Sequence, residues 1–175
     1  MTLSCEGITL RAVEPEDLEL FYIWENNESL WSQSNTLVPF SKFTLKRYID
    51  NSHKSIYETG QLRLMIDLRD ENKTIGTIDL FDFDHFHSRA GLGILIADES
   101  YRHKGYASMA MKCIINYAFV TLRLHQLWCN ILESNKESLA LFQKHGFNVC
   151  GQKKEWVKAD NGYISELILQ LINNL

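Results

Sequence analysis

Three cationic side chains and a glycine stand together where the sequence pattern changes. They are Arg102, His103, Lys104 and Gly105; the aliphatic run GLGILIA (91–97) precedes them and a helix-like pattern (105–122) follows. A strand that passes through a tight glycine turn into a helix presents unpaired backbone N–H groups and the positive end of the helix to an anion. Cationic side chains add charged donors that suit phosphate. The cluster is therefore a candidate anion-binding site, and a solvated turn is the alternative.

Two familiar phosphate-binding motifs do not fit this cluster. The motif G-x-x-x-x-G-K-[ST] is absent, because Lys104 precedes Gly105 instead of following it. The run GLGILI carries two glycines without the third of a dinucleotide fingerprint, and it lies within the expected strand. A nucleotide-binding regulatory protein is therefore disfavoured.

The bulk composition limits the partners and the location. The chain has 175 residues, 45% of them apolar and 23% charged, which is typical of a globular domain. A net charge of −4 argues against a nucleic-acid partner, which would favour a basic face. The sequence shows neither a secretory signal nor an apolar run of about 20 residues that could span a bilayer. We therefore expect a cytoplasmic protein that does not bind a membrane.

The cysteines and the histidines indicate neither disulfides nor a metal. Cys5, Cys113, Cys129 and Cys150 form no C-x-x-C pair, so we expect reduced, mostly buried thiols. The segment 79–89 (DLFDFDHFHSR) concentrates acids and histidines, but its spacing is not a recognised ligand set. We expect no metal site.

Hydrophobic periodicity and turn residues predict an α/β (α+β) domain with a mostly antiparallel sheet. A long loop is expected over 26–41, and Ser41 is a candidate helix cap. Ser134 and Glu137 stand at capping-box spacing before the last helix. The expected strands are 7–13, 61–68, 74–84, 89–97, 126–133, 147–159 and 163–172, and the expected helices are 16–28, 42–54, 105–122 and 134–147.

Two segments resemble the GNAT N-acetyltransferase superfamily. Arg102-x-x-Gly105-x-Ala107 is similar to its acyl-CoA signature [QR]-x-x-G-x-[GA], and 135–147 is similar to its element N-x-x-[AS]-x-x-[LI]-[YF]-x-K-x-GF. The segments LRAVEPEDLE and WENNES also resemble the spermidine and ribosomal-protein N-acetyltransferase branch. The resemblance implies one GNAT domain over 1–175, with a sheet that splays between its fourth and fifth strands and about four flanking helices. A homodimer is left open.

The resemblance also implies a site for acetyl-CoA or CoA. The cationic cluster would hold the pyrophosphate, the backbone of Leu95 and Ala97 would pair with the pantetheine amides, and Asn135 could bond the pantetheine arm or cap a helix. The implied cofactor-binding residues are Leu95, Ile96, Ala97, Arg102, His103, Lys104, Gly105, Tyr106, Ala107, Asn135, Ser138 and Phe142.

The catalytic groups are less well defined than the cofactor site. Phe142 stands at the position of the family's usual tyrosine acid and cannot donate a proton. The thiolate could then be protonated by Ser138 or by water, or leave unaided; Ser138 could equally be a surface hydroxyl. A backbone N–H near Ile96 would polarise the thioester carbonyl. Asp82 or Asp84, and Glu133, are candidate bases or amine-binding groups, with solvated strand ends as the alternative.

The sequence therefore predicts an acetyl-CoA-dependent N-acetyltransferase that acts by direct attack. Its acceptor would be a primary amine, namely a small amine, a polyamine or a peptide amine. A non-catalytic acyl-CoA-binding or sensing module is the alternative. The segment 32–40 carries no acid and Gly91 begins the fourth strand, so a polyamine finds fewer carboxylates than in the spermidine enzymes. Trp24, Trp31 and Phe40 either pack in the core or line an apolar entrance.

Overall fold

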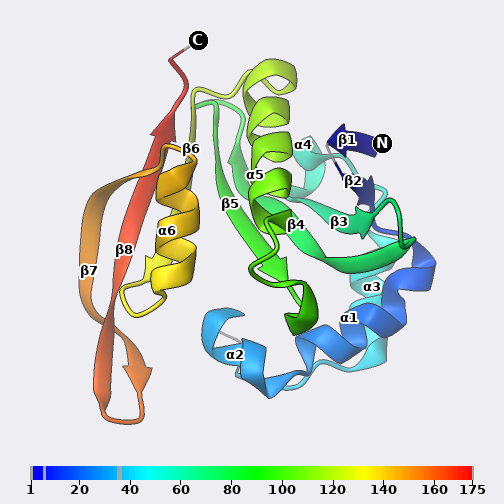
Figure 1. The fold of residues 1–175 in the computed structure, drawn as a ribbon, viewed down its shortest axis with the longest axis horizontal. Helices are drawn as coiled ribbons and strands as arrows, with labels where there is room; N and C mark the ends of the chain where they lie inside the picture. The colour runs from blue at the N-terminus through cyan, green and yellow to red at the C-terminus, as the bar shows by residue number, and fades with distance from the viewer. Residues whose placement is uncertain (1, 6, 35–36, 175) are drawn as a thin grey trace.

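The computed structural model describes residues 2–5, 7–34 and 37–174, and these residues form a mixed sheet flanked by helices (Figure 1). Within the described residues the sheet has eight strands in the order β1-β2-β3-β4-β5-β6-β8-β7. Neighbouring strands are antiparallel, apart from the parallel pair β5 and β6. The strands are β1 (Thr2–Cys5), β2 (Ile8–Ala12), β3 (Leu62–Leu68), β4 (Lys73–Asp84), β5 (Arg89–Ile96), β6 (Gln126–Leu132), β7 (Asn148–Ala159) and β8 (Gly162–Ile172).

Helices cover both faces of this sheet. On one face, α5 and α6 pack over the larger apolar core; on the other, α1 and α3 enclose a smaller one. The helices are α1 (Leu18–Glu25), α2 (Glu28–Ser34), α3 (Lys42–Asp50), α4 (Ile56–Thr59), α5 (Tyr106–Asn116) and α6 (Lys136–Lys144), with short turns η1 (Pro15–Asp17), η2 (Glu99–Tyr101) and the π-type turn η3 (Tyr117–Thr121).

Alternation along β3 directs side chains to both cores. Leu64 and Ile66 lie in the core under α5, whereas Met65 packs with Phe21 of α1 and Ile49 of α3. All three β3 side chains are at most 1% exposed. A strand with apolar residues on both faces is expected where helices cover both sides of a sheet. This double cover holds β4 and β5, which carry the candidate site, in the middle of the fold.

Ion pairs fix α1 against the sheet. Arg11 of β2 bonds Asp17 just before α1, at 2.7 Å, and Arg63 of β3 bonds Asp79 of β4 at 2.6 Å and Glu25 at the end of α1 at 3.3 Å. Burial is the largest single influence on Arg63 and disfavours its charged form, but the charges and hydrogen bond of Asp79, Tyr48 and Glu25 together outweigh it, so the pKa of the guanidinium is raised. Both ends of α1 are thus held over the face opposite α5.

The predicted splay between the fourth and fifth predicted strands is confirmed, as the fold class is. These strands are β5 and β6, and they pair only over Arg89–Gly91 and Gln126–Trp128. Beyond that point β5 continues to Ile96 without a partner on this side. The strand therefore presents an open backbone edge next to the cationic cluster.

Several local predictions need correction. The predicted loop 26–41 contains α2, and residues 35–36 of that loop lie outside the described part of the chain. The strand β1 and the short helix α4 were also missed. The N-cap of α6 is Asn135 rather than Ser134, while Ser41 caps α3 as predicted, accepting a bond from the Thr44 amide. The prediction that 1–175 form one domain stays a prediction.

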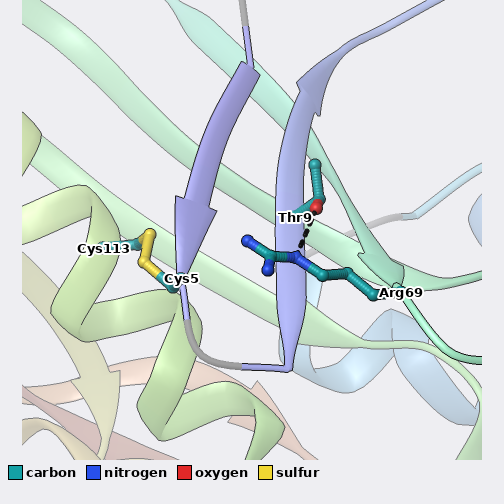
Figure 2. The surroundings of a disulfide bond; sticks show 4 residues. All are labelled: Cys5, Thr9, Arg69 and Cys113. Carbon is teal, nitrogen blue, oxygen red and sulfur yellow. Dashed lines mark hydrogen bonds between the residues drawn. A yellow bond between two sulfur atoms is a disulfide. The ribbon is translucent and has the colours of Figure 1, made fainter.

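The expectation of four reduced, mostly buried thiols is wrong. Cys5 at the end of β1 forms a disulfide with Cys113 of α5 across 108 residues of sequence (Figure 2). Cys150 is exposed, and only Cys129 fits the expected buried free thiol, with a pKa that burial raises to about 12. Wide spacing in sequence gave no sign that β1 would lie beside α5.

Among the described residues, no helix is long and apolar enough to cross a bilayer. The cytoplasmic location stays a prediction.

Replacing Cys5 by Ser should lower the stability of the protein. A crosslink that closes a long loop restricts the unfolded chain, and its loss typically costs about 2–4 kcal/mol. Thermal melting should show a lower midpoint for Cys5→Ser, and added reductant should lower the wild-type midpoint but not that of the variant. The control is Cys150→Ser, which removes a free exposed thiol. A wild-type midpoint that ignores reductant would contradict the bond.

Candidate active site

The start of α5 is an uncapped helix end. Gly105, its N-cap, has a left-handed backbone (φ 89°) and no side-chain cap bond. The first intrahelical bond joins the Met109 amide to the Gly105 carbonyl at 3.1 Å. The three amides before it, those of Tyr106, Ala107 and Ser108, therefore have no acceptor within the helix. This end of α5 offers N–H groups and the positive pole of the helix to an anion.

Gly105 leaves space above these amides. A Cβ built on it would meet nothing within 4 Å, so the backbone is open to a ligand here. His103, two residues earlier, also has a positive φ of 59°, so two residues of this turn have a left-handed backbone, as is common where successive N–H groups surround an anion. The sequence assigned this turn to anion binding, and its geometry fits that assignment.

Arg102 is held in place with donor capacity left over. Its Nε donates to the carbonyl oxygen of Ile96 at 3.0 Å, and its Nη1 lies 3.3 Å from Glu99. Its Nη2 is buried and has no hydrogen-bond partner in the described part of the structure. A buried guanidinium nitrogen without an acceptor is costly, and a bound anion is one group that can satisfy it. Arg102 thus ties the end of β5 to the turn.

A cavity of about 280 Å³ joins the turn to the open edge of β5 and to α6. The cationic cluster and the last predicted helix thus line one cavity. The α6 residues that line it recur at helical spacing (Glu137, Leu141, Lys144), a signal that could have identified them from the sequence. The lining is Ile94, Leu95, Ile96, Tyr101, Arg102, His103, Gly105, Tyr106, Ala107, Ser108, Glu137, Ser138, Leu141 and Lys144.

The open backbone groups of β5 belong to alternate residues. The Ala97 amide donates to the carbonyl of Ile75 at 2.9 Å, and a Cβ on Gly76 would lie 2.0 Å from the Leu95 carbonyl oxygen. Leu95 and Ala97 therefore face β4 with these backbone groups. Because backbone directions alternate along a strand, Ile94 and Ile96 face the splay. Leu95 and Ala97, which were expected to pair with pantetheine, thus direct these groups toward β4 rather than toward the open edge. The pantetheine pairing and the donor near Ile96 stay predictions.

The other cations of the cluster point elsewhere. Lys104 lies over the ring of Tyr101, with its Nζ 5.0 Å from the ring centroid, and does not line the cavity. His103 lines it, and its Nε2 is 3.7 Å from a Glu137 oxygen. Both side chains are thus less fixed than Arg102 and supply charge rather than a defined contact.

Asn135 serves as a helix cap. Its Oδ1 accepts the Ser138 amide at 3.1 Å, which leaves its Nδ2 available as a donor. Ser138 lines the cavity and is partly buried. Ser138 is therefore well placed for the proton-donor role that the sequence suggested, and that role stays a prediction.

Phe142 was predicted to bind the cofactor and does not line the cavity. It is 3% exposed and packs edge-on against Phe147, with ring centroids 5.0 Å apart. The helix face at 137, 141 and 144 lines the cavity instead, because Phe142 projects toward the core. The residue is a core residue in this chain.

A second cavity, of about 730 Å³, contains Asp82 and lies on the other face of the sheet. Trp128 and Asn130 of β6 line it, whereas the intervening Cys129 belongs to the core under α6. Glu133, the other predicted base, is exposed on the turn after β6 and lines neither cavity. The full lining is Asp82, Asp84, Arg89, Gln126, Trp128, Asn130, Cys150, Lys153, Ile168 and Gln170.

Residues 8–148 match the family description Acetyltransferase (GNAT) domain. The chain belongs to the GNAT acetyltransferase family. It is 29% identical over 152 residues to the spermidine N(1)-acetyltransferase of Escherichia coli (strain K12), covering 85% of this chain and 77% of the relative. It is 25% identical to an uncharacterized N-acetyltransferase, p20, of Bacillus licheniformis, covering 98% and 96%.

The same GNAT fold is seen in solved structures. The crystal structure of spermidine N-acetyltransferase from Vibrio cholerae, in complex with CoA and spermine, superposes with a TM-score of 0.85 over 95% of each chain, at 22% identity. A probable acetyltransferase also superposes with a TM-score of 0.85, at 22% identity. The protein is therefore an N-acetyltransferase of the GNAT family, and its uncapped α5, open β5 edge and buried Arg102 nitrogen fit a CoA thioester.

Gly105→Asp should abolish acetyl-CoA binding. The new carboxylate stands at the uncapped helix end and repels a phosphate there. The matched control is Gly60→Asp, because Gly60 also has a left-handed backbone (φ 71°) with open space at its Cβ, and it caps α4 away from both cavities. Calorimetry should show at least a 100-fold loss of affinity for Gly105→Asp and wild-type affinity for the control. Equal affinities would contradict the assignment of the turn.

Phe142→Tyr should destabilise the enzyme without raising turnover. A hydroxyl added to this ring would lie in the apolar core, and an unpaired buried hydroxyl costs about 1–3 kcal/mol. Ser138→Ala, by contrast, should lower turnover by about 10²-fold or more if Ser138 protonates the thiolate. Melting and thiol-release rates are measured together for both variants. A faster Phe142→Tyr enzyme would return the donor role to position 142.

Proposed function

We propose that the protein transfers the acetyl group of acetyl-CoA to a primary amine by direct attack. The uncapped end of α5 beside the open edge of β5 carries this proposal, because one groove then offers donors to a pyrophosphate and to an extended amide chain. The amides of Tyr106, Ala107 and Ser108, together with Arg102, hold the phosphates. The edge at Ile94 and Ile96 pairs with the pantetheine arm and positions the thioester.

The two cavities divide the reaction between the faces of the sheet. The acetyl thioester supplies an electrophilic carbonyl carbon, and a backbone N–H at Ile96 stabilises negative charge on its oxygen. The neutral amine nitrogen forms the new C–N bond, and the C–S bond breaks. Asp82 binds the amine or accepts its surplus proton, directly or through one water. Ser138, which lines the cofactor cavity, passes a proton from a water molecule to the thiolate, so that its own hydroxyl is restored and CoA leaves as the thiol.

The alternative predicted from the sequence, a non-catalytic acyl-CoA-binding module, is disfavoured by the family match and by relatives named as N-acetyltransferases. Thiol release separates the two, since only the enzyme frees CoA when an amine is added. The spermidine N-acetyltransferase of Vibrio cholerae was crystallised with CoA and spermine, which supports CoA as the product here and an amine as the acceptor. A homodimer stays a prediction.

Thermal shift with acetyl-CoA, CoA and ATP, followed by thiol release with a panel of amines, tests the proposal. A ligand that binds only the folded protein raises its melting midpoint. We expect acetyl-CoA and CoA, but not ATP, to raise it, and at least one primary amine to release CoA. Stabilisation by ATP without CoA would overturn the proposal. Binding of CoA without turnover of any amine would leave the non-catalytic module.

A further inference from the structure

The second cavity borders the splay from the face opposite the cofactor groove. Trp128 is the last residue of β6 that pairs with β5, and Asn130 lies two residues beyond, where the strands have separated. The β8 residues opposite them, Gln170 and Ile168, complete the same face. A molecule in this cavity therefore lies where β5 and β6 separate. In the proposed function, the thioester lies at the same place.

The charges around this cavity are paired except for one acid. Asp82 and Asp84 are its acids, and Arg89 and Lys153 are its bases. Arg89 bonds Asp84 at 3.0 Å, and Lys153 bonds the buried Glu166 at 2.7 Å. The pKa of Asp84 is lowered to about 2, first by the His87 backbone N–H, so this carboxylate is ionised and already engaged. The cavity therefore offers one unpaired acid, Asp82, and no second one for a ligand with several cations.

Asp82 is the one lining acid with a free carboxylate. Among the described residues it forms no hydrogen bond or ion pair. Its backbone is left-handed (φ 46°), at a bulge where the register of β4 and β5 shifts between Phe81 and Asp84. Bulges of this kind redirect a side chain, and strained backbone is concentrated at functional sites. Asp82 is thus a single anionic contact placed in an otherwise neutral cavity.

The remaining polar groups of the cavity are amides. Gln170 donates to Gln126 at 2.6 Å, which leaves a donor on Gln126 and an acceptor on Gln170. No hydrogen bond joins the Asn130 side chain to any described residue. Amides that retain both donors and acceptors suit neutral groups such as hydroxyls, which both donate and accept.

An apolar surface completes the cavity. The indole of Trp128 packs edge-on against Phe81, with centroids 5.2 Å apart. A Cβ on Gly91 would lie 2.3 Å from the Phe81 ring, so this glycine makes room for the aromatic pair. Trp128 is therefore held in a fixed position and can contact the apolar side of a ring-shaped ligand.

We propose that this cavity binds the acceptor, and that the acceptor is a monoamine carrying hydroxyl groups, of the amino-sugar class, rather than a polyamine. The proposal rests on the acetyltransferase function argued above. Asp82 binds the amino group, the amides bind hydroxyls, and Trp128 contacts the ring. The further cations of a polyamine would be repelled by Arg89 and Lys153 and would have no second free carboxylate to bind.

Three amines distinguish which features of the acceptor the cavity recognises. Glucosamine has one cation, a ring and hydroxyls; cyclohexylamine has the cation and ring alone; spermidine has several cations and no ring. With acetyl-CoA saturating, thiol release should give a kcat/KM for glucosamine at least 10-fold above that of each other amine. An equal or higher value for spermidine overturns the proposal, and so does an absence of glucosamine turnover in protein that binds acetyl-CoA.

Two variants test the named contacts. Asp82→Asn should raise KM for glucosamine at least 10-fold while KM for acetyl-CoA stays unchanged, and Asp70→Asn, in the exposed β3–β4 turn outside both cavities, is the control. Asn130→Leu should remove the preference for glucosamine over cyclohexylamine. Unchanged KM in Asp82→Asn overturns the proposal. If acetyl-CoA causes no thermal shift, the proposed function itself fails, which distinguishes the two failures.

Discussion

The early end of pairing between β5 and β6 is the constraint on which the site depends. Strands in a sheet normally satisfy one another's backbone groups, and a buried unpaired group is costly. Here the parallel pair ends at Gly91 and Trp128, and β5 runs on with one edge open. The open edge is tolerable because it borders a cavity rather than apolar core, and because Arg102 satisfies the Ile96 carbonyl. The two cavities, one on each face of the sheet, both border this separation.

The remainder of the fold keeps the separated strands in register. The other edge of β5 pairs with β4 from Gly76 to Phe81, and the close contact between Gly76 and the Leu95 carbonyl leaves no room for a side chain. On the face opposite α5, Arg63 joins Asp79 of β4 to Glu25 of α1. Such partly buried pairs add little net stability but fix the relative placement of their elements, since breaking one leaves an uncompensated charge. These contacts of β4 thus fix the position of β5, whose other edge is open.

Local sequence predicted much of this arrangement. Alternation identified the strands that form β2 to β8, and helical spacing identified α1, α3, α5 and α6, because both patterns are imposed by burial on one side. The cationic turn was found because its residue types are unusual for a simple loop. Prediction from local sequence failed where nonlocal geometry decides, because the Cys5–Cys113 bond needs β1 to lie beside α5.

Predictions of the roles of individual side chains failed for the same reason, because nonlocal packing decides them. Family spacing put Phe142 in the site, but the helix phase relative to the core directs it to Phe147 instead. Leu95 and Ala97 were chosen over Ile94 and Ile96 because a strand edge has two sides that sequence does not distinguish. Asp82 was recognised as an acid near the acceptor, whereas its left-handed backbone and the neutral surroundings became visible only with the bulge in place.

The absence of a side-chain cap on α5 has a consequence for the lifetime of the protein. Replacing an N-cap serine or asparagine by glycine typically costs only a few tenths of a kcal/mol, so Gly105 gives up little helix stability in leaving this end of α5 open. Under the proposed function, the phosphates of acetyl-CoA take the place of that cap and complete the first turn of α5. Opening of this turn exposes backbone to proteases, and saturation with acetyl-CoA suppresses the opening. Under the proposed function, bound acetyl-CoA would therefore protect this turn of α5 from cleavage.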